Sequence, residues 1–393
     1  MRLLIVVPES PFLTNPVAFP PLGSLYVAAS AESMGAEVRI VDLSWQELPD
    51  WDYDYAGISA STSHVAAVRS LIPRLRVPVI VGGPHFDIVP NDYMEVGADA
   101  ASRGDGEDTI RRFLTGERGL IDGRCDDWPM PARHLIDLSK YRYDLGGVPT
   151  TSMVTSRGCP YSCAYCCKTS MGRKVRLNPI EKVREEVREI KRLGFGGVML
   201  YDDEINLTPG RLEALCDVMR QEGMRWRGFV RSDLFTRRQA ERMKESGCYE
   251  LCSGVESGSD EILTKMGKRA KVADATRCRR ICREVGIRFK AFMMIGLPGE
   301  TEDTIRQTER WLLAERPDDF DLCPFIPYPG SPIMNDPGRY GVNVVEDYWH
   351  SSYFHKAMPG SYRVHSSVNG LSADKIAALR EEIYETVHHN LRA

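Results

Sequence analysis

The chain has 393 residues, of which 42% are hydrophobic and 27% charged, and its net charge at neutral pH is −4. This length allows two domains, and the composition is that of an ordinary soluble globular protein rather than a disordered chain. The slight negative charge argues against a broad nucleic-acid surface. No apolar run approaches the roughly 20 residues that span a bilayer. We therefore expect the protein to bind neither nucleic acid nor a membrane.

Residues 1–115 show an alternation of strands and helices that predicts a small α/β domain. A helix over residues 22–34 ends at Gly35, and the predicted strands are 3–7, 38–43, 55–59, 77–81 and 98–103. Small polar residues and glycines follow several of these strands, where ligands of open parallel sheets bind. The candidate binding positions at this edge are Pro21, Gly23, Ser59, Ser61, Thr62, Gly82, Gly83, His85, Gly104 and Gly106.

This domain resembles the Rossmann-like cobalamin-binding domain, and the resemblance implies cobalamin as a cofactor. Two features depart from that pattern. No Asp-x-His-x-x-Gly follows the first strand, so no histidine is offered to cobalt, and a lone histidine such as His85 is usually structural. Residues 44–54 are too few for a crossover helix. We therefore expect one sheet face to be partly uncovered, either filled by a second subunit, as in a homodimer, or left bare in a remnant domain.

Residues 116–150, which include three prolines at positions 129, 131 and 149, are predicted to be a linker. The loop that follows contains Cys159, Cys163 and Cys166 in a C-x3-C-x2-C pattern. Three thiolates at this spacing can hold three irons of a [4Fe–4S] cluster and leave the fourth iron without a protein ligand. An iron with an open position can bind and reduce a substrate directly. Reduced cluster thiols indicate a cytoplasmic protein.

Two other interpretations of these cysteines stay open. Zinc requires four tetrahedral ligands, and the nearest fourth thiol is Cys167, whose side chain points away from that of its neighbour Cys166. The three cysteines could also simply pack in a core, since the chain has 11 cysteines in all. Cys278 and Cys282 lie one helical turn apart, and we expect them in the core rather than at a second cluster.

From about residue 150 to 330, strands and helices alternate at roughly 30-residue spacing, which predicts βα units. Predicted helices over residues 178–193 and 209–222 end at Gly194 and Gly223, and two later helices end at Gly247 and Gly286. Glycine accepts the left-handed conformation at a helix end at low cost. The predicted strands are 151–156, 198–201, 225–233, 249–255, 288–295 and 320–327. We therefore predict a partial (β/α)6 TIM-type barrel over residues 151–331, with its chemistry at the carboxyl ends of the strands.

The segment from Ser156 to Cys166 resembles the cluster loop of radical S-adenosylmethionine (SAM) enzymes. The resemblance implies that SAM binds the open iron and is reductively cleaved to a 5′-deoxyadenosyl radical, which abstracts a substrate hydrogen. It also implies a low-potential electron donor of flavodoxin or ferredoxin type. The SAM-binding positions it implies are Tyr165, Asp203, Glu204, Arg231, Glu256, Ser257, Gly296, Pro298 and Phe325.

The residue types at these positions suit the implied contacts. One acid of Asp202-Asp203-Glu204 would hold the SAM ammonium group, although acids there could instead cap the next helix. The planar fork of Arg231 matches a carboxylate, with an ordinary ion pair as the alternative. Glu256 can accept hydrogen bonds from both ribose hydroxyls.

Residues 332–393 are predicted to be a C-terminal cap with a closing helix over 373–388. Large polar aromatic residues between positions 340 and 355 would form a lid that shields the radical from water, or else a surface extension.

The leading hypothesis is a radical SAM enzyme that methylates a carbon atom of a small polar metabolite with the help of cobalamin, in specialised metabolism. The alternative is a cobalamin-independent dehydrogenase or dehydratase of a sugar or aminocyclitol, as in antibiotic biosynthesis. A third hypothesis is a zinc- or iron-sensing binding protein.

Overall fold

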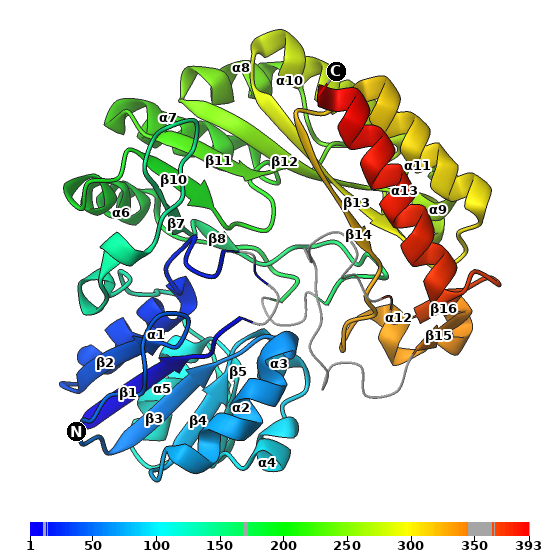
Figure 1. Cartoon of the computed structure of the whole chain (residues 1–393). Helices are drawn as coiled ribbons and strands as arrows, with labels where there is room; N and C mark the ends of the chain where they lie inside the picture. The colour runs from blue at the N-terminus through cyan, green and yellow to red at the C-terminus, as the bar shows by residue number, and fades with distance from the viewer. Residues whose placement is uncertain (11–12, 14, 168–171, 345–363, 365, 393) are drawn as a thin grey trace. The chain divides into compact units, whose positions relative to one another are not determined.

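The computed structural model describes residues 1–392 except 11–12, 14, 168–171, 345–363 and 365 (Figure 1). The chain divides into two compact units. One unit includes Met1–Arg142, and the other includes Tyr143–Cys166 and the described residues from Arg173 onward. No helix in the described part of the chain is long and apolar enough to cross a membrane.

The amino-terminal unit is built on a parallel six-stranded sheet in the order β2-β1-β3-β4-β5-β6. Buried side chains of α1 and α5 pack on one face, and those of α2 pack on the other. This is the predicted Rossmann-like fold. Its elements are β1 (Arg2–Val7), α1 (Leu22–Glu32), β2 (Glu37–Asp42), β3 (Tyr55–Ser59), α2 (Val65–Leu71), β4 (Val79–Gly82), α3 (Pro84–Ile88), α4 (Asp92–Val96), β5 (Ala100–Gly104), α5 (Gly106–Leu114) and β6 (Gly119–Gly123).

Two expectations for this unit need correction. Residues 119–123, assigned above to a linker, form β6 and pair with β5 along their whole length. No helix connects β2 to β3, as predicted, but the sheet face is not left bare there. Leu48, Trp51 and Tyr53 of the irregular connection pack against the core on that face, because large side chains fill the space a helix would occupy.

The second unit contains a parallel sheet in the order β7-β10-β11-β12-β13-β14, with helices on its outer face (Figure 1). This open six-stranded arrangement is the predicted partial barrel. Its elements are β7 (Thr150–Met153), β8 (Ser156–Arg157), β9 (Arg176–Leu177), α6 (Ile180–Arg192), β10 (Gly197–Leu200), α7 (Pro209–Glu222), β11 (Arg225–Phe229), α8 (Arg237–Glu245), β12 (Cys248–Glu256), α9 (Asp260–Lys265), α10 (Val272–Val285), β13 (Arg288–Ile295), α11 (Glu302–Glu315), β14 (Asp319–Pro324), α12 (Pro332–Asn335), β15 (Val342–Val344), β16 (Ser366–Val368) and α13 (Ala373–Arg392).

Alternation along the strands separates the two faces of this sheet. Residues such as Leu251 and Phe289 point outward into the core beneath the helices, and Cys278 and Cys282 lie in the same core, as expected. The predicted helix stops at Gly223 and Gly286 are confirmed, since both glycines adopt the left-handed conformation. Helix α13 packs against β14 and α11. The aromatic positions 348–355 of the expected lid lie outside the described residues.

Candidate active site

The cluster loop begins where the first barrel strand ends, and buried acids after β10 fix its entry. The Asp202 carboxylate, which is 2% exposed, accepts hydrogen bonds from the backbone N–H and the hydroxyl of Thr155, both at 2.7 Å, and from the Ser156 hydroxyl. The Gly158 N–H donates to Asp203 Oδ2 at 3.0 Å. Burial raises the pKa of Asp202, although the hydrogen bonds from Ser156 and Thr155 favour its ionised form. Two acids of the predicted SAM-ammonium segment therefore anchor the loop that precedes Cys159.

The middle of the loop is held by the rim of the barrel. The Ala164 N–H donates to the Met266 carbonyl at 2.8 Å, and the Ile333 N–H donates to the Ala164 carbonyl at 3.1 Å. The guanidinium of Arg231 lies 3.5 Å from the centre of the Tyr161 ring. Backbone and side-chain contacts from several rim segments thus converge on one loop of eight residues.

Tyr165 connects the loop to the end of β12. Its hydroxyl donates to Glu256 Oε1 at 3.1 Å, and the Lys268 ammonium lies 2.9 Å from the same oxygen. Burial raises the pKa of Tyr165 well above its usual value, with the Glu256 charge adding to the effect, so the hydroxyl keeps its proton. Glu256 has a positive φ of 70°, which is rare outside glycine and marks a constrained backbone at a strand end.

The three predicted cluster ligands lie on this loop, Cys159 and Cys163 buried and Cys166 partly exposed. Within the described residues, no group of three His, Cys, Asp or Glu side chains is arranged to hold a metal ion, so the thiols share the loop without converging on one point. Their number and spacing nevertheless fit a cluster with one iron left open, since all three donors are thiols on a short loop. Cys159, Cys163 and Cys166 would hold the cluster.

A second loop of the rim follows β13. Gly296 has a φ of +84°, and the Glu300 side chain accepts hydrogen bonds from the Gly296 and Leu297 N–H groups at 2.6 and 3.0 Å. Glu300 is fully buried, and the Ser257 side chain is a further hydrogen-bond neighbour of its carboxyl group. Burial raises the pKa of Glu300 to about 8. Glu300 therefore shapes the loop predicted to approach adenine.

The raised pKa of Glu300 has a consequence for stability. Between about pH 4.5 and 8 the folded chain keeps a proton that the unfolded chain releases, so the free energy of unfolding falls as pH rises. Glu300→Gln removes this ionisation but keeps an acceptor oxygen. Between pH 6 and pH 8 the native chain should lose up to about 2.7 kcal/mol of unfolding free energy that the variant does not lose. Denaturant unfolding of both chains at both pH values measures this difference. Exposed Glu261→Gln is the control, and an equal, pH-independent difference for both variants would contradict the assignment.

The remaining predicted SAM positions are buried except Glu204, which is partly exposed. Ser257 is fully buried, and its hydroxyl accepts a hydrogen bond from the Ser259 N–H at 3.2 Å. Gly296, Pro298 and Phe325 are also buried. Their contacts with SAM stay predictions. Glu204 follows β10, where its charge acts on Arg231.

The predicted cobalamin positions lie mainly at the carboxyl edge of the amino-terminal sheet. Gly83 has a φ of +91°, and a Cβ there would lie 2.8 Å from the Ala60 carbonyl oxygen and 2.9 Å from the Ser59 hydroxyl, so only glycine permits this approach of the two loops. A Cβ on Gly82 would meet Ser102 at 3.1 Å. Glycine therefore lets the ends of β3, β4 and β5 pack closely at the edge where the cofactor is expected to bind.

The other residues of this edge have local roles. His85 is fully buried, and its ring nitrogens lie 3.3 Å from the Thr62 hydroxyl and 2.9 Å from the Asp92 carboxylate, so both nitrogens are engaged. This arrangement favours a structural role. Ser61 contacts His64 Nδ1 at 2.8 Å, and burial lowers the pKa of that histidine to about 4.

The glycines and proline near α1 and α5 complete this set. Gly104 has a φ of +91°, and a Cβ there would clash with the Gly123 carbonyl. Gly106 begins α5, where a Cβ would lie 2.8 Å from Val27 of α1. Pro21 precedes α1, and a side chain at Gly23 would face open space.

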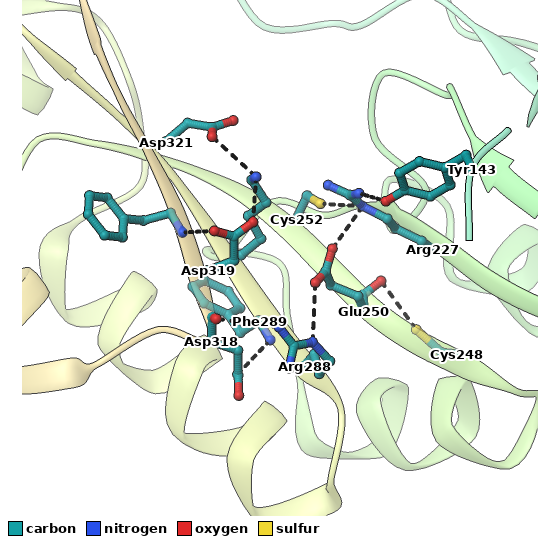
Figure 2. A network of polar contacts seen from close by, with 12 residues as sticks. Tyr143, Arg227, Cys248, Glu250, Cys252, Arg288, Phe289, Asp318, Asp319 and Asp321 are labelled. Atoms are coloured by element: carbon teal, nitrogen blue, oxygen red, sulfur yellow. Dashed lines mark hydrogen bonds and ion pairs between the residues drawn. The ribbon is translucent and has the colours of Figure 1, made fainter. Parts of the chain in front are cut away.

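Sequence reasoning missed a network of charged residues on the concave face of the barrel sheet (Figure 2). Arg227 of β11 pairs with Glu250 of β12 at 2.9 Å, and Glu250 lies 3.5 Å from Arg288 of β13. Lys290 pairs with Asp319 at 2.6 Å and Asp321 at 3.2 Å. Charged residues at alternate positions of otherwise apolar predicted strands are the signal that could have revealed this face.

Comparison with known proteins agrees with this geometry. The family described as the radical SAM superfamily matches residues 153–312, and the B12 binding domain matches residues 14–114. An uncharacterized methyltransferase of Pyrococcus horikoshii is 28% identical over 382 residues, covering 84% of this chain and 82% of that protein. Hopanoid C-3 methylase of Methylococcus capsulatus is 28% identical over 365 residues, covering 81% of this chain and 69% of the relative.

A solved structure shows the same fold. The radical SAM methyltransferase TsrM from Kitasatospora setae, with cobalamin and a [4Fe–4S] cluster bound, superposes with a TM-score of 0.72 at 17% identity, covering 100% of this chain and 88% of that one.

The chain therefore carries a radical SAM domain over residues 153–312 and a B12-binding domain over residues 14–114. It is an enzyme whose cofactors are a [4Fe–4S] cluster, SAM and cobalamin, which confirms the cofactor predictions and overturns the metal-sensor hypothesis.

Proposed function

We propose that this enzyme is a cobalamin-dependent radical SAM methyltransferase that adds a methyl group to a carbon atom of a small polar metabolite in specialised metabolism. The pairing of a B12-binding domain with a radical SAM barrel carries the proposal. Two relatives that each cover more than four fifths of this chain are named a methyltransferase and a methylase. When bound, the cluster would supply an electron to SAM, and cobalamin would supply the methyl group; a flavodoxin- or ferredoxin-type donor would reduce the cluster.

The concave network, whose charged residues lie mostly toward the amino ends of β12, β13 and β14, makes the floor of the barrel polar. Arg227 and Lys290 are largely buried, and each is paired with acids on neighbouring strands. Burial lowers the pKa of Lys290, but the Asp321 and Asp319 carboxylates outweigh that effect and raise the pKa, so the amine stays charged. An extended hydrocarbon placed against this face would strip water from the charged side chains and offer no hydrogen bonds in return, which is unfavourable. We infer a substrate rich in oxygen or nitrogen.

A small apolar surface accompanies these charges. Phe229 and Phe292 stack with ring centres 5.9 Å apart, and both side chains are partly exposed. The two rings lie further along β11 and β13 than the charged residues, and they can pack against the carbon skeleton of a metabolite.

The cobalamin-independent alternative was motivated by the missing crossover helix between β2 and β3. That helix is absent, but side chains of the connection cover the sheet face in its place, which favours an intact cofactor domain.

Product mass tests the proposal. The chain, reconstituted anaerobically with iron, sulfide and hydroxocobalamin, is incubated with a reductant, SAM carrying a deuterated methyl group and a small-molecule extract of the producing cells. We expect a bound corrinoid spectrum and a metabolite that gains one labelled methyl group. Cys163→Ala should still bind the corrinoid but label nothing. Absence of bound corrinoid, or a product that loses hydrogen or water without gaining label, would overturn the proposal.

A further inference from the structure

Arg231, predicted above to bind the SAM carboxylate, has its side chain committed elsewhere. Its guanidinium lies 3.5 Å from the centre of the Tyr161 ring, and Tyr161 stands between two predicted cluster ligands. Two of its nitrogens, Nε and a terminal one, donate to the two Asp233 oxygens at 2.9 and 3.0 Å. The Arg231 side chain is only 5% exposed. One face and one edge of the guanidinium are therefore occupied by protein.

The backbone of Arg231 is fixed as firmly as its side chain. The Asn206 side chain donates to the Arg231 carbonyl at 3.0 Å and accepts from the Arg231 N–H at 2.9 Å. Asn206 is 1% exposed and follows β10. Residues after two neighbouring strands, β10 and β11, thus hold Arg231 in place against the cluster loop.

We propose that Arg231 is a positioning residue that fixes the Tyr161 portion of the cluster loop and offsets the negative charge of Asp233 beside that loop. The proposal rests on the cluster assignment to Cys159, Cys163 and Cys166, but not on methyl transfer. The cation–π contact between buried Arg231 and partly exposed Tyr161 restricts the loop between the first two thiols. Because Arg231 neutralises the Asp233 carboxylate, losing the arginine would leave an uncompensated negative charge near the loop and would disfavour reduction of the cluster.

The test uses the full chain with its reconstituted cluster and measures iron release to a chelator, the midpoint potential of the cluster and the affinity for SAM. Tyr161→Leu and Arg231→Met should each release iron about tenfold faster, the effect of losing one desolvated cation–π contact. Because both variants remove the same contact, the double variant should be no faster than either. Tyr161→Phe should behave like the native chain, since it keeps the ring face.

The midpoint potential of the cluster measures the effect of the Arg231 charge separately. Arg231→Met should shift this potential to more negative values. Arg231→Lys keeps the charge, so its midpoint potential should lie close to that of the native chain. Arg238→Met, at a side chain that is 90% exposed, is the control for loss of an arginine elsewhere. Circular dichroism checks folding, and if Arg231→Met does not fold, Tyr161→Leu and Arg231→Lys carry the test.

If Arg231 instead binds the SAM carboxylate, the variants should give a different pattern. If Tyr161→Leu keeps iron and potential like the native chain while Arg231→Met binds SAM at least about tenfold more weakly, Arg231 is a carboxylate ligand and the proposal fails. Additive effects in the double variant would also overturn it. Failure of methyl transfer alone changes none of these readouts, so the two proposals are tested separately.

Discussion

Replacing Cys159, Cys163 or Cys166 by alanine should abolish formation of 5′-deoxyadenosine from SAM. Each thiolate is expected to hold one iron, and two thiolates cannot keep a cluster whose remaining iron stays open for SAM. The measurement is chromatography of 5′-deoxyadenosine after incubation with SAM and a strong reductant, together with iron and sulfide content.

Cys167→Ala is the matched control for this experiment. Cys167 adjoins Cys166, but its side chain leaves the backbone in a different direction, and the turn that brings Cys166 N–H to 3.0 Å from the Cys163 carbonyl does not include it. We expect this variant to keep most of the activity. Activity that survives loss of Cys166 but not of Cys167 would contradict the assignment of the ligands.

Replacing Asp202 by alanine should have the largest effect on stability outside the cluster. Its buried carboxylate accepts hydrogen bonds from Thr155 N–H and from the hydroxyls of Thr155 and Ser156. Removing it leaves these buried donors unsatisfied, which we expect to cost about 3–5 kcal/mol. Because Thr155 and Ser156 lead into the cluster loop, iron retention should fall as well. Denaturant unfolding and iron content measure the two effects.

Asp202→Asn separates the loss of the hydrogen bonds from the loss of the charge. The amide keeps one acceptor oxygen for Thr155 N–H in a side chain of nearly equal size, so we expect a smaller loss of stability than for alanine. An alanine variant as stable as the native chain would show that Asp202 does not anchor the loop entry.

Where local signals agree with the global fold, the sequence predicts the elements closely. Strand β13 lies between two glycines and has the same bounds, residues 288–295, in the structure and in the prediction. Helix α7 begins at a proline and ends before a glycine, so both of its ends are also predicted correctly. Such segments carry their own start and stop signals.

Other features depend on contacts between distant residues, and the sequence could not provide them. Strand β6 has a single buried residue, Ile121, and two glycines, so its extended conformation depends on pairing with β5. The motif identified the cluster cysteines, but the Tyr161–Arg231 contact joins residues 70 positions apart. Likewise, no local pattern indicates that Asp202 rather than Glu204 holds the loop entry, because this depends on the three-dimensional course of the chain.

Electron paramagnetic resonance of the anaerobically reduced protein, recorded with and without SAM, tests the central claim most directly. A cluster held by Cys159, Cys163 and Cys166 should give the signal of a reduced [4Fe–4S] centre, and that signal should change when SAM occupies the open iron. A spectrum that SAM leaves unchanged, or the absence of any iron–sulfur signal, would contradict the account.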